Sequence, residues 1–285
     1  MAAPADNRSY LVGLIGSGIG GSRSPALHES EAASQGLRYL YKLVDLQRLG
    51  GDAAILPRLL EAMELTGFTG TNVTHPCKHA VVPLLDQLSP AAAAIGAVNT
   101  VVFAEGRRSG HNTDCWGFAE SFRRGLPDAE REVVVQLGAG GAGAAVAVAA
   151  LDLGVRRLLI HDREAARADA LVERLSARPG DATVERVDDL RSALAAADGL
   201  IHATPTGMAG HGGIALDPDL LHAGQWVADV VYVPLETELL KAARQRGCRT
   251  LDGGGMAVFQ AVRAFELFTG IRPDAERMLH RFAEL

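Results

Sequence analysis

The sequence predicts an α/β protein in which two domains are each built from strands that alternate with helices. Segments with the apolar pattern of strands and segments with apolar residues at helical spacing follow one another along almost the whole chain. At 285 residues the chain is long for a single hydrophobic core. Such regular alternation is typical of a mainly parallel sheet with helices on both faces.

The first half of the chain opens with strand–helix–strand units. We expect, in chain order, a strand at 10–15, a helix from 25 to about 36, a strand at 39–45, a helix from about 52 to 67 and a strand at 68–73. There follow a helix from about residue 77, a helix that starts at Ser89-Pro90, and strands at 99–103 and 107–112 joined by Glu105-Gly106. A helix over 115–124 then bridges to the second half, and the turn residues at 125–128 mark the boundary.

The strand–helix pattern restarts at Glu132. Expected strands lie at 133–137, 157–161, 183–187, 200–202, 226–231 and 249–251. Expected helices start after Gly143, cover 164–175 and begin at about residue 236, and the chain ends in helices over 256–268 and from about 273 to 282. The second half therefore also reads as a mainly parallel sheet between helices.

Composition favours a small molecule as the partner. The formal net charge is −6 and no block of lysine or arginine is present, so neither nucleic acid nor a membrane surface is the expected partner. Three widely spaced cysteines, Cys77, Cys115 and Cys248, are typical of free thiols in a reducing compartment, which indicates the cytoplasm. The uncharged run 133–151 is rich in alanine and glycine, so we expect strand, turn and helix rather than a membrane span. A monomer or a homodimer is expected.

The motif Gly-x-Gly-x-x-Gly occurs twice, and its second copy has the context of a dinucleotide-binding loop. A valine-rich strand precedes Gly138 and an alanine-rich helix follows the loop, while Asp162 ends the next strand. The predicted cofactor residues here are Gly138, Ala139, Gly140, Gly141, Ala142, Gly143 and Asp162. Asp162 can accept hydrogen bonds from a ribose diol and would repel a 2′-phosphate, so NAD is favoured over NADP. Arg163 and Arg167 leave NADP open, because cations there can hold that phosphate.

The first copy of the motif, at Gly16, Gly18 and Gly21, runs into Ser22-Arg23-Ser24-Pro25. Ser24 is expected to cap a helix whose first residue is Pro25. Asp45 ends the following strand, which keeps nucleotide binding open for this loop as well. We favour a different use, in which Ser22 and Ser24 present their hydroxyls to a small anionic substrate.

Polar side chains gather directly after the strand predicted at 68–73. Asn72, Thr74 and Lys78 lie in the run Gly70 to Lys78, where a loop at a strand end can face a cleft. The alternative is a solvated strand-to-helix turn with Pro76 at the first helical position. Further polar candidates are Asn99, Asp114 and Gln260. Each also has a purely structural explanation: Asn99 can close a turn, Asp114 can cap a helix, and Gln260 can lie on a solvated helix face.

These pieces, in their order and spacing, resemble the shikimate dehydrogenase family with its quinate/shikimate dehydrogenase relatives from Tyr10 to the C-terminal helices. In the first half the matching runs are Ser22-Arg23-Ser24-Pro25 with His28, Asn72-Val73-Thr74-His75-Pro76-x-Lys78, Gly96-Ala97-Val98-Asn99-Thr100 and Gly110-x-Asn112-Thr113-Asp114. In the second half they are Gly138 to Gly143, Ala203-Thr204-Pro205-x-Gly207-Met208, Asp229-x-x-Tyr232-x-Pro234-Leu235 and Asp252-Gly253-Gly254-Gly255-Met256.

The resemblance implies a substrate-binding domain over 1–115, completed by C-terminal helices at 253–285, and a doubly wound, Rossmann-type NAD-binding domain over 116–252. It implies that Lys78 and Asp114 form the catalytic pair. Substrate contacts are assigned to Ser22, Ser24, Asn72, Thr74, Asn99, Tyr232 and Gln260, and further cofactor contacts to Arg163, Thr204 and Gly255.

The expected reaction interconverts shikimate and 3-dehydroshikimate in aromatic amino acid biosynthesis. Hydride passes between the substrate carbon and the nicotinamide, while Lys78, oriented by Asp114, transfers the proton. His161-Asp162-Arg163 resembles the NAD-linked branch, which often accepts quinate, whereas quinate users frequently have Ser-x-Thr where this chain has Ser22-Arg23-Ser24. We therefore expect shikimate as substrate, with quinate as a candidate second substrate.

Three alternatives to this interpretation remain. One is a dehydrogenase that prefers quinate or an amino-substituted analogue, and another is a non-catalytic sensor of these acids. A third is a zinc site built from His75, Cys77, His79, His111 and Cys115. No metal is expected, because Pro76 restricts the loop and a paired Cys-x-x-Cys is absent from the sequence.

Overall fold

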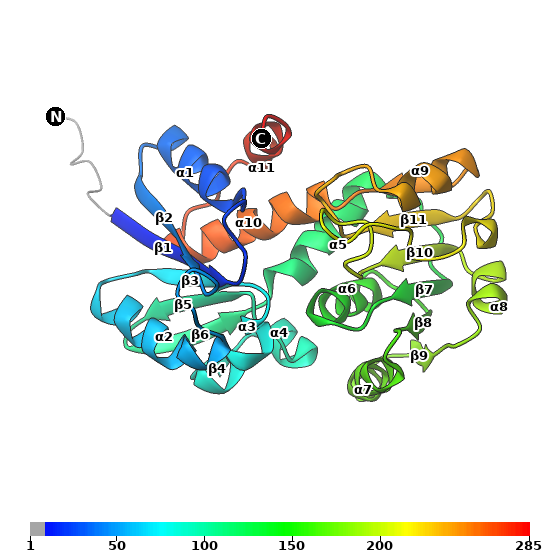
Figure 1. Ribbon diagram of the computed structural model, residues 1–285, viewed down its shortest axis with the longest axis horizontal. Coiled ribbons are helices and arrows are strands. Elements are labelled where there is room, and N and C mark those ends of the chain that lie inside the picture. Colours follow the sequence, from blue (N-terminus) through cyan, green and yellow to red (C-terminus); the bar gives the residue numbers. More distant parts are fainter. Residues whose placement is uncertain (1–8) are drawn as a thin grey trace. The chain divides into compact units, whose positions relative to one another are not determined.

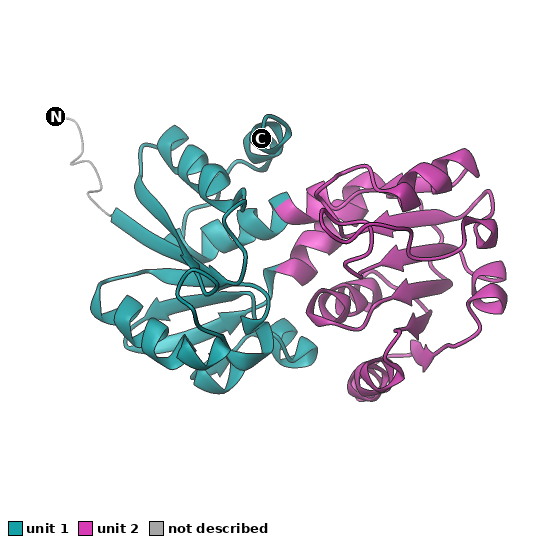
Figure 2. Ribbon diagram, in the orientation of Figure 1, with its two compact units in different colours: residues 1–113, 258–285 teal, residues 114–257 magenta. Residues whose placement is uncertain are grey.

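The computed structural model describes residues 9–285 and divides into two compact units. Unit 1 contains the chain up to residue 113 together with 258–285, and unit 2 contains 114–257 (Figure 2). The chain passes from one unit to the other inside two helices, α5 (Thr113–Gly125) and α10 (Gly254–Thr269). The predicted division into functional domains after residues 115 and 252 remains a prediction.

Unit 1 contains a six-stranded mixed sheet (Figure 1). Its strands are β1 (Ser9–Gly16), β2 (Arg38–Asp45), β3 (Gly70–Val73), β4 (Gln87–Leu88), β5 (Thr100–Ala104) and β6 (Arg107–His111), in the spatial order β2-β1-β3-β5-β6-β4. β1 is parallel to β2 and β3, whereas β5 is antiparallel to both β3 and β6. Three of the five neighbouring pairs are parallel, so the sheet is mainly parallel as expected. The predicted turn at Glu105-Gly106, with φ of 52° and 70°, joins β5 and β6 as an antiparallel hairpin.

Helices cover both faces of this sheet. They are α1 (Ser24–Ser34), α2 (Leu56–Leu65), α3 (Cys77–Ala80), α4 (Pro90–Ile95), the end of α10, and α11 (Ala275–Ala283), with short 3₁₀ helices at Ala53–Ile55 and Val82–Leu84. Leu14 of β1 packs with Phe268 of α10, whereas its neighbour Ile15 packs with Leu60 of α2. Because successive strand residues point to opposite faces, α10 and α2 lie on opposite sides of the sheet (Figure 1).

The sequence predicts a serine cap for two helices of unit 1, and the structure confirms one of them. Ser89 caps α4 as predicted, since its Oγ accepts a hydrogen bond from Ala92 N–H at 3.3 Å. The prediction that Ser24 caps α1 is wrong. Ser24 is the first helical residue, and it is the Ser22 hydroxyl that accepts from the Ser24 N–H, at 3.3 Å. Ser22 thus satisfies an N–H that has no partner inside the helix.

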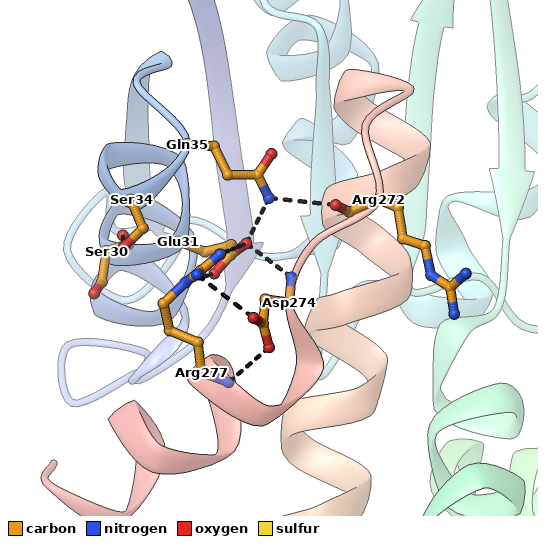
Figure 3. Close-up of polar contacts among 7 residues, drawn as sticks. All are labelled: Ser30, Glu31, Ser34, Gln35, Arg272, Asp274 and Arg277. Carbon is orange, nitrogen blue, oxygen red and sulfur yellow. Dashed lines mark hydrogen bonds and ion pairs between the residues drawn. The ribbon is translucent and has the colours of Figure 1, made fainter.

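The C-terminal helix α11 is fastened to α1 by a buried carboxylate (Figure 3). Glu31 of α1 is 1% exposed, and its two oxygens accept Arg277 Nε–H at 2.7 Å and Arg277 Nη2–H at 2.8 Å. Asp274 N–H donates to the same carboxylate at 2.8 Å, and the Gln35 amide also bonds to it. Burial, the largest single effect, raises the pKa of Glu31, but the hydrogen bonds from Arg277, Asp274 and Gln35 and the Arg277 charge together outweigh it, so that pKa lies below its usual value.

Unit 2 is a fully parallel doubly wound sheet. Its strands are β7 (Val133–Leu137), β8 (Arg157–His161), β9 (Thr183–Arg186), β10 (Gly199–His202), β11 (Trp226–Asp229) and β12 (Arg249–Leu251), in the order β12-β11-β10-β7-β8-β9. Every neighbouring pair is parallel. Counted from β7 this is the Rossmann strand order, with the reversal between β7 and β10. The predicted Rossmann-type architecture is confirmed.

Helices also cover both faces of the second sheet. They are α5, α6 (Gly141–Asp152), α7 (Ala165–Ser176), α8 (Leu190–Ala195) and α9 (Glu238–Gln245), with a 3₁₀ helix at Pro218–Leu220. Val135 packs with Leu194 of α8 and Leu240 of α9, whereas the next residue, Gln136, bonds to Gly143 of α6. The run 133–151 is therefore strand, turn and helix, although α6 begins at Gly141 and not after Gly143. Among the described residues, no helix is both long and apolar enough to span a membrane.

Candidate active site

In unit 1 the predicted substrate residues lie at the carboxyl ends of β1 and β3. β1 lies between β2 and β3, so the next strand in the sequence, β2, is on one side of β1 and the following one, β3, is on the other; the strand order reverses at β1. Open α/β sheets bind ligands at such a reversal. Ser22 and Ser24 follow β1, Asn72 lies in β3, Thr74 follows β3, and Lys78 lies in α3. Backbone hydrogen bonds of 2.9 Å, Ser17 N to His75 O and Thr74 N to Ile15 O, join the two loops.

The Asn72 amide is held in one orientation. Its Nδ2 donates to the carbonyl oxygen of Asn99 at 3.2 Å and to Thr100 Oγ1 at 2.9 Å. A carbonyl only accepts, so the atom facing it must be the nitrogen. Asn72 Oδ1 accepts from the Tyr41 hydroxyl at 2.7 Å. Both amide hydrogens are used inside the protein, so Asn72 can offer a ligand only a remaining lone pair of Oδ1.

The Asn99 amide has the opposite character. Its Oδ1 accepts from Thr113 N–H at 2.8 Å and from the Thr100 hydroxyl at 3.0 Å. A backbone N–H only donates, which fixes the oxygen at this position. Asn99 Nδ2 donates one hydrogen to Thr113 Oγ1 at 3.0 Å, and an amide nitrogen carries two. Asn72 can therefore accept from a ligand hydroxyl and Asn99 can donate to one, a combination that suits a substrate with several hydroxyls.

Sequence reasoning missed Tyr41, which links two of the predicted residues. Tyr41 is 5% exposed, and burial raises the pKa of its phenol while a hydrogen bond with Ser24 acts the other way. The phenol therefore stays protonated and donates to Asn72. Beside it, burial lowers the pKa of His28 to about 3, so that ring is neutral and its Nδ1 bonds to the Tyr39 hydroxyl at 3.0 Å. The only signal in the sequence was two tyrosines two positions apart in one strand.

The remaining substrate candidates occupy helices and a loop. Lys78 and Gln260 are half-buried residues of α3 and α10 in unit 1. Asp114 is 7% exposed and lies in the first turn of α5, where the helix dipole favours a carboxylate. Tyr232 is 40% exposed, after β11. Because Asp114 and Tyr232 belong to unit 2, the Lys78–Asp114 pair and the Tyr232 contact remain proposals.

The glycine loop after β7 has the shape of a dinucleotide site. Gly138 has φ of 100°, and a Cβ there would lie 2.5 Å from Ala203 O. A Cβ on Gly143 would lie 2.2 Å from Gly138 O, so only glycine lets α6 approach the strand this closely. A Cβ on Gly140 would meet no atom of the described chain within 4 Å. Gly140 is the N-cap of α6, so the open space lies at the helix N-terminus, where phosphate binds well.

Two side chains hold this loop from inside the unit. Gln136 is fully buried in β7, and its Nε2 donates to Gly138 O at 2.8 Å and to Gly143 O at 2.9 Å. Asp162 follows β8, and its carboxylate accepts Ala139 N–H at 2.7 Å and Glu164 N–H at 2.9 Å. Sequence reasoning missed Gln136, because its partners are backbone atoms of the loop and helix that follow β7.

The other predicted cofactor residues are also in unit 2. Arg163 is exposed, and Arg167 Nη2 pairs with Glu164 Oε1 at 2.9 Å. Thr204 is half-buried in the loop after β10. Gly255 is explained by packing, because a Cβ there would lie 2.2 Å from the Ser121 hydroxyl of α5. The glycine loop and Asp162 thus lie together, whereas packing against α5 by itself accounts for glycine at position 255.

The thiols proposed for a zinc site are poorly suited to it. Burial raises the pKa of Cys77 to about 11 and, as the largest of several effects, that of Cys115 to about 12. Zinc binds the thiolate, which burial disfavours at both positions. Within residues 9–285, no three His, Cys, Asp or Glu side chains form a group that could hold a metal ion.

Unit 1 offers a polar edge with oriented amides, and unit 2 offers a Rossmann loop for a dinucleotide. That combination is characteristic of the dinucleotide-dependent dehydrogenases. Family models match three stretches: the shikimate dehydrogenase substrate binding domain at 14–101, shikimate / quinate 5-dehydrogenase at 120–208, and the shikimate 5′-dehydrogenase C-terminal domain at 253–281. The chain belongs to the shikimate dehydrogenase family.

Relatives resemble the chain over almost its whole length. A Streptomyces avermitilis protein named shikimate dehydrogenase (NADP(+)) is 61% identical and the match covers 97% of this chain and 96% of that protein. A Corynebacterium efficiens quinate/shikimate dehydrogenase (NAD(+)) is 51% identical over 97% of this chain and 99% of its own. The solved structure of quinate dehydrogenase from Corynebacterium glutamicum in complex with NAD is 49% identical, with a TM-score of 0.92 over 97% of this chain and 99% of that one.

Proposed function

We propose that this protein interconverts shikimate and 3-dehydroshikimate with a nicotinamide dinucleotide as hydride carrier, and that quinate is a candidate second substrate. Membership of the shikimate dehydrogenase family over nearly the whole chain supports the reaction class. The structural observation that carries the proposal is the pair of oriented amides, Asn72 as acceptor and Asn99 as donor, at the ligand-binding edge of unit 1. Ser22, Ser24 and Thr74 add hydroxyls at the same edge.

The chemistry assigned to this chain is the transfer of a proton. When the substrate is oxidised, its carbon loses a hydride and its hydroxyl loses a proton. A bound nicotinamide dinucleotide supplies the hydride acceptor. Lys78 takes the proton from the hydroxyl oxygen and returns it in the reverse direction, and Asp114 orients the Lys78 amine. Gln260 and Tyr232 complete the contacts with the acid.

We further propose NAD as the preferred cofactor. Asp162 directly follows β8, where the adenosine ribose of a dinucleotide is held in this fold, and its carboxylate would repel a 2′-phosphate. Arg167, the more distant of the two arginines, is paired with Glu164, which leaves it less suited to phosphate. Relatives are divided, since the Corynebacterium proteins are named for NAD and the Streptomyces avermitilis protein for NADP.

A quinate-preferring enzyme is the second candidate. The solved quinate dehydrogenase has a TM-score of 0.92 to this chain, which favours it. The pair of serines at Ser22 and Ser24, where quinate users frequently have Ser-x-Thr, favours shikimate. Two further alternatives remain: an enzyme that prefers an amino-substituted analogue, and a protein that binds the acids without catalysis. Rate measurements distinguish these alternatives from a shikimate dehydrogenase.

A two-by-two rate assay tests these proposals. Initial rates are measured with NAD and NADP, each with shikimate and with quinate, at equal concentrations below saturation. The expected result is the highest kcat/KM for NAD with shikimate. A higher value with quinate would overturn the substrate choice, and a higher value with NADP would overturn the cofactor choice. Dinucleotide and acid binding without turnover in all four combinations would instead support the sensor.

A further inference from the structure

A buried chain of hydrogen bonds runs beside the dinucleotide loop of unit 2. His202 ends β10 and Asp229 ends β11, and the two are direct partners in the register of these parallel strands. Both side chains are fully buried, with His202 Nδ1 at 2.9 Å from Asp229 Oδ1. His202 Nε2 lies 2.5 Å from Thr204 Oγ1. These hydrogen bonds therefore connect the buried Asp229 carboxylate, through His202, to the half-buried hydroxyl of Thr204.

That hydroxyl lies next to the first glycine of the cofactor loop. A Cβ on Gly138 would be 3.0 Å from Thr204 Cγ2 and 2.5 Å from the backbone oxygen of Ala203. β7 and β10 are neighbours at the point where the strand order of this sheet reverses, which is where doubly wound sheets bind dinucleotides. Thr204 thus lies at the edge of the sheet at which the cofactor is proposed to bind.

The partners determine where each hydrogen is. Asp229 Oδ1 accepts Val231 N–H at 3.0 Å, and Asp229 Oδ2 accepts the Thr237 hydroxyl at 2.7 Å. An ionised carboxylate only accepts, so His202 Nδ1 must donate to it. With Nδ1 as the ring's N–H, Nε2 is the acceptor and the Thr204 hydroxyl donates to it. The hydrogen of the Thr204 hydroxyl therefore points inward.

We propose that Asp229 and His202 are positioning residues that make Thr204 a hydrogen-bond acceptor for the bound dinucleotide. Thr204 Oγ1 also receives Thr206 N–H at 3.3 Å, and its remaining lone-pair capacity is available to an N–H or O–H donor of the ligand. Such donors are the carboxamide of the nicotinamide and the ribose hydroxyls. The inference rests on the proposed function, because it requires that unit 2 binds a dinucleotide.

The test is a double-mutant cycle on the dissociation constant of NAD, measured by titration of the purified protein. Thr204→Val is expected to weaken NAD binding roughly threefold to tenfold, the value of one hydrogen bond. Thr204→Ser, which keeps the hydroxyl, is the matched control and should stay close to wild type. His202→Gln should weaken binding in the wild-type background but add nothing in the Thr204→Val background.

A purely structural role of His202 gives a different result. Lost folding reduces the number of binding sites but not their affinity, so the dissociation constant reports positioning and a thermal unfolding midpoint reports stability. Multiplicative effects of His202→Gln and Thr204→Val on affinity would overturn the proposal, as would an unchanged affinity in Thr204→Val. Should His202→Gln fail to fold, Asp229→Asn replaces it in the same cycle, because it keeps the shape and changes the hydrogen on the ring.

An analogue identifies the donor on the ligand. 3-Acetylpyridine adenine dinucleotide lacks the carboxamide N–H, so the effect of Thr204→Val should vanish with it if the carboxamide is the donor and persist if a ribose hydroxyl is. Failure of the inference and failure of the proposed function are distinguishable. A wild-type protein that binds NAD but oxidises neither acid contradicts only the function, whereas one that binds neither NAD nor NADP contradicts both.

Discussion

The two glycine loops share one sequence pattern and differ in structure. Each loop follows the first strand of its sheet in chain order, and each is held by an aspartate at the end of the next strand: Asp45 is the last residue of β2, and Asp162 directly follows β8. Asp45 accepts Gly18 N–H at 2.9 Å and Ile19 N–H at 3.2 Å, and Asp162 accepts Ala139 N–H at 2.7 Å. Gly-x-Gly-x-x-Gly with a following aspartate therefore describes a turn that closes on a carboxylate, whatever the turn later binds.

The difference lies in where the helix begins. In unit 2, α6 starts at Gly141, inside the motif, and a Cβ on Gly143 would clash with Gly138 O at 2.2 Å. In unit 1, α1 starts only at Ser24, beyond the motif, and a Cβ on Gly21 would meet no atom of residues 9–285 within 4 Å. A pyrophosphate needs the helix N-terminus at the loop, so the second loop suits a dinucleotide and the first suits presenting hydroxyls.

The largest expected effect separates chemistry in unit 1 from cofactor binding in unit 2. Lys78→Ala should lower kcat by about a hundredfold to ten thousandfold, because the proton has no positioned acceptor, and should leave the dissociation constant of NAD nearly unchanged. Steady-state rates and NAD titration measure the two quantities. The neighbouring His79→Ala is the control and should keep nearly full activity. Wild-type turnover in Lys78→Ala would remove Lys78 from the mechanism.

The third glycines of the two loops provide the next test. Gly143→Ala should lower the free energy of unfolding by about 1–3 kcal/mol and weaken NAD binding, because the new methyl group forces α6 away from β7. Gly21→Ala should change stability by no more than about 0.5 kcal/mol. Urea unfolding and NAD titration of both variants check this. Equal losses in the two variants would contradict the structural difference between the loops.

The two aspartates should differ in their effect on cofactor choice. Asp162→Asn is expected to lower the ratio of kcat/KM for NAD to that for NADP by about tenfold or more, because the charge that repels a 2′-phosphate is lost. Asp45→Asn should leave this ratio unchanged, whatever it does to stability. The ratio is measured at fixed acid concentration. If Asp45→Asn shifted the ratio and Asp162→Asn did not, the assignment of the two loops would be reversed.

Tyr41→Phe tests the orientation of the Asn72 amide. The variant removes the donor to Asn72 Oδ1 and keeps the aromatic ring, so the KM for the acid should rise roughly threefold to tenfold while the KM for the dinucleotide stays the same. Tyr39→Phe, on the same strand, is the matched control because its hydroxyl bonds to His28 instead. A rise of both Michaelis constants in Tyr41→Phe would indicate a general loss of structure.

The last prediction concerns stability alone, at the helix α1 that begins after the first loop. The pKa of Glu31 is lowered in the folded protein, so its contribution to stability is present above the unfolded pKa and is lost as pH falls through the folded pKa. Glu31→Gln should therefore cost about 1–3 kcal/mol at pH 7, and the difference from wild type should shrink below about pH 4. Unfolding free energies across this pH range measure it. A difference that stays constant with pH would contradict the account of Glu31.

Elements whose ends depend on neighbouring residues could be predicted from the sequence. The cap Ser89 of α4, the Glu105-Gly106 turn and the strand–turn–helix at 133–151 are local in this sense. The prediction of Ser24 as the cap is wrong because the hydroxyl of Ser22, two positions earlier, accepts the backbone N–H at the start of α1. A local pattern also cannot tell which of two nearby hydroxyls accepts a backbone N–H.

The hydrogen bonds made by polar residues inside strands could not be predicted from the sequence. Tyr41, Gln136, His202 and Asp229 each have at least one hydrogen-bond partner on another strand or on a helix, and the sequence pattern does not reveal that contact. The same holds for the orientation of Asn72 and Asn99, which is fixed by backbone groups of separate elements. Residue types at the site were visible in the sequence, whereas their hydrogen-bonding directions required the fold.

The central claim is that the hydride moves directly between the bound acid and the bound dinucleotide, while Lys78 accepts or donates the proton. The most direct measurement uses shikimate labelled with deuterium at C3, the carbon whose hydroxyl is oxidised, in ordinary water. The account predicts that the reduced nicotinamide formed carries the deuterium. Reduced nicotinamide without the label, or no reduced nicotinamide from either NAD or NADP, would contradict it.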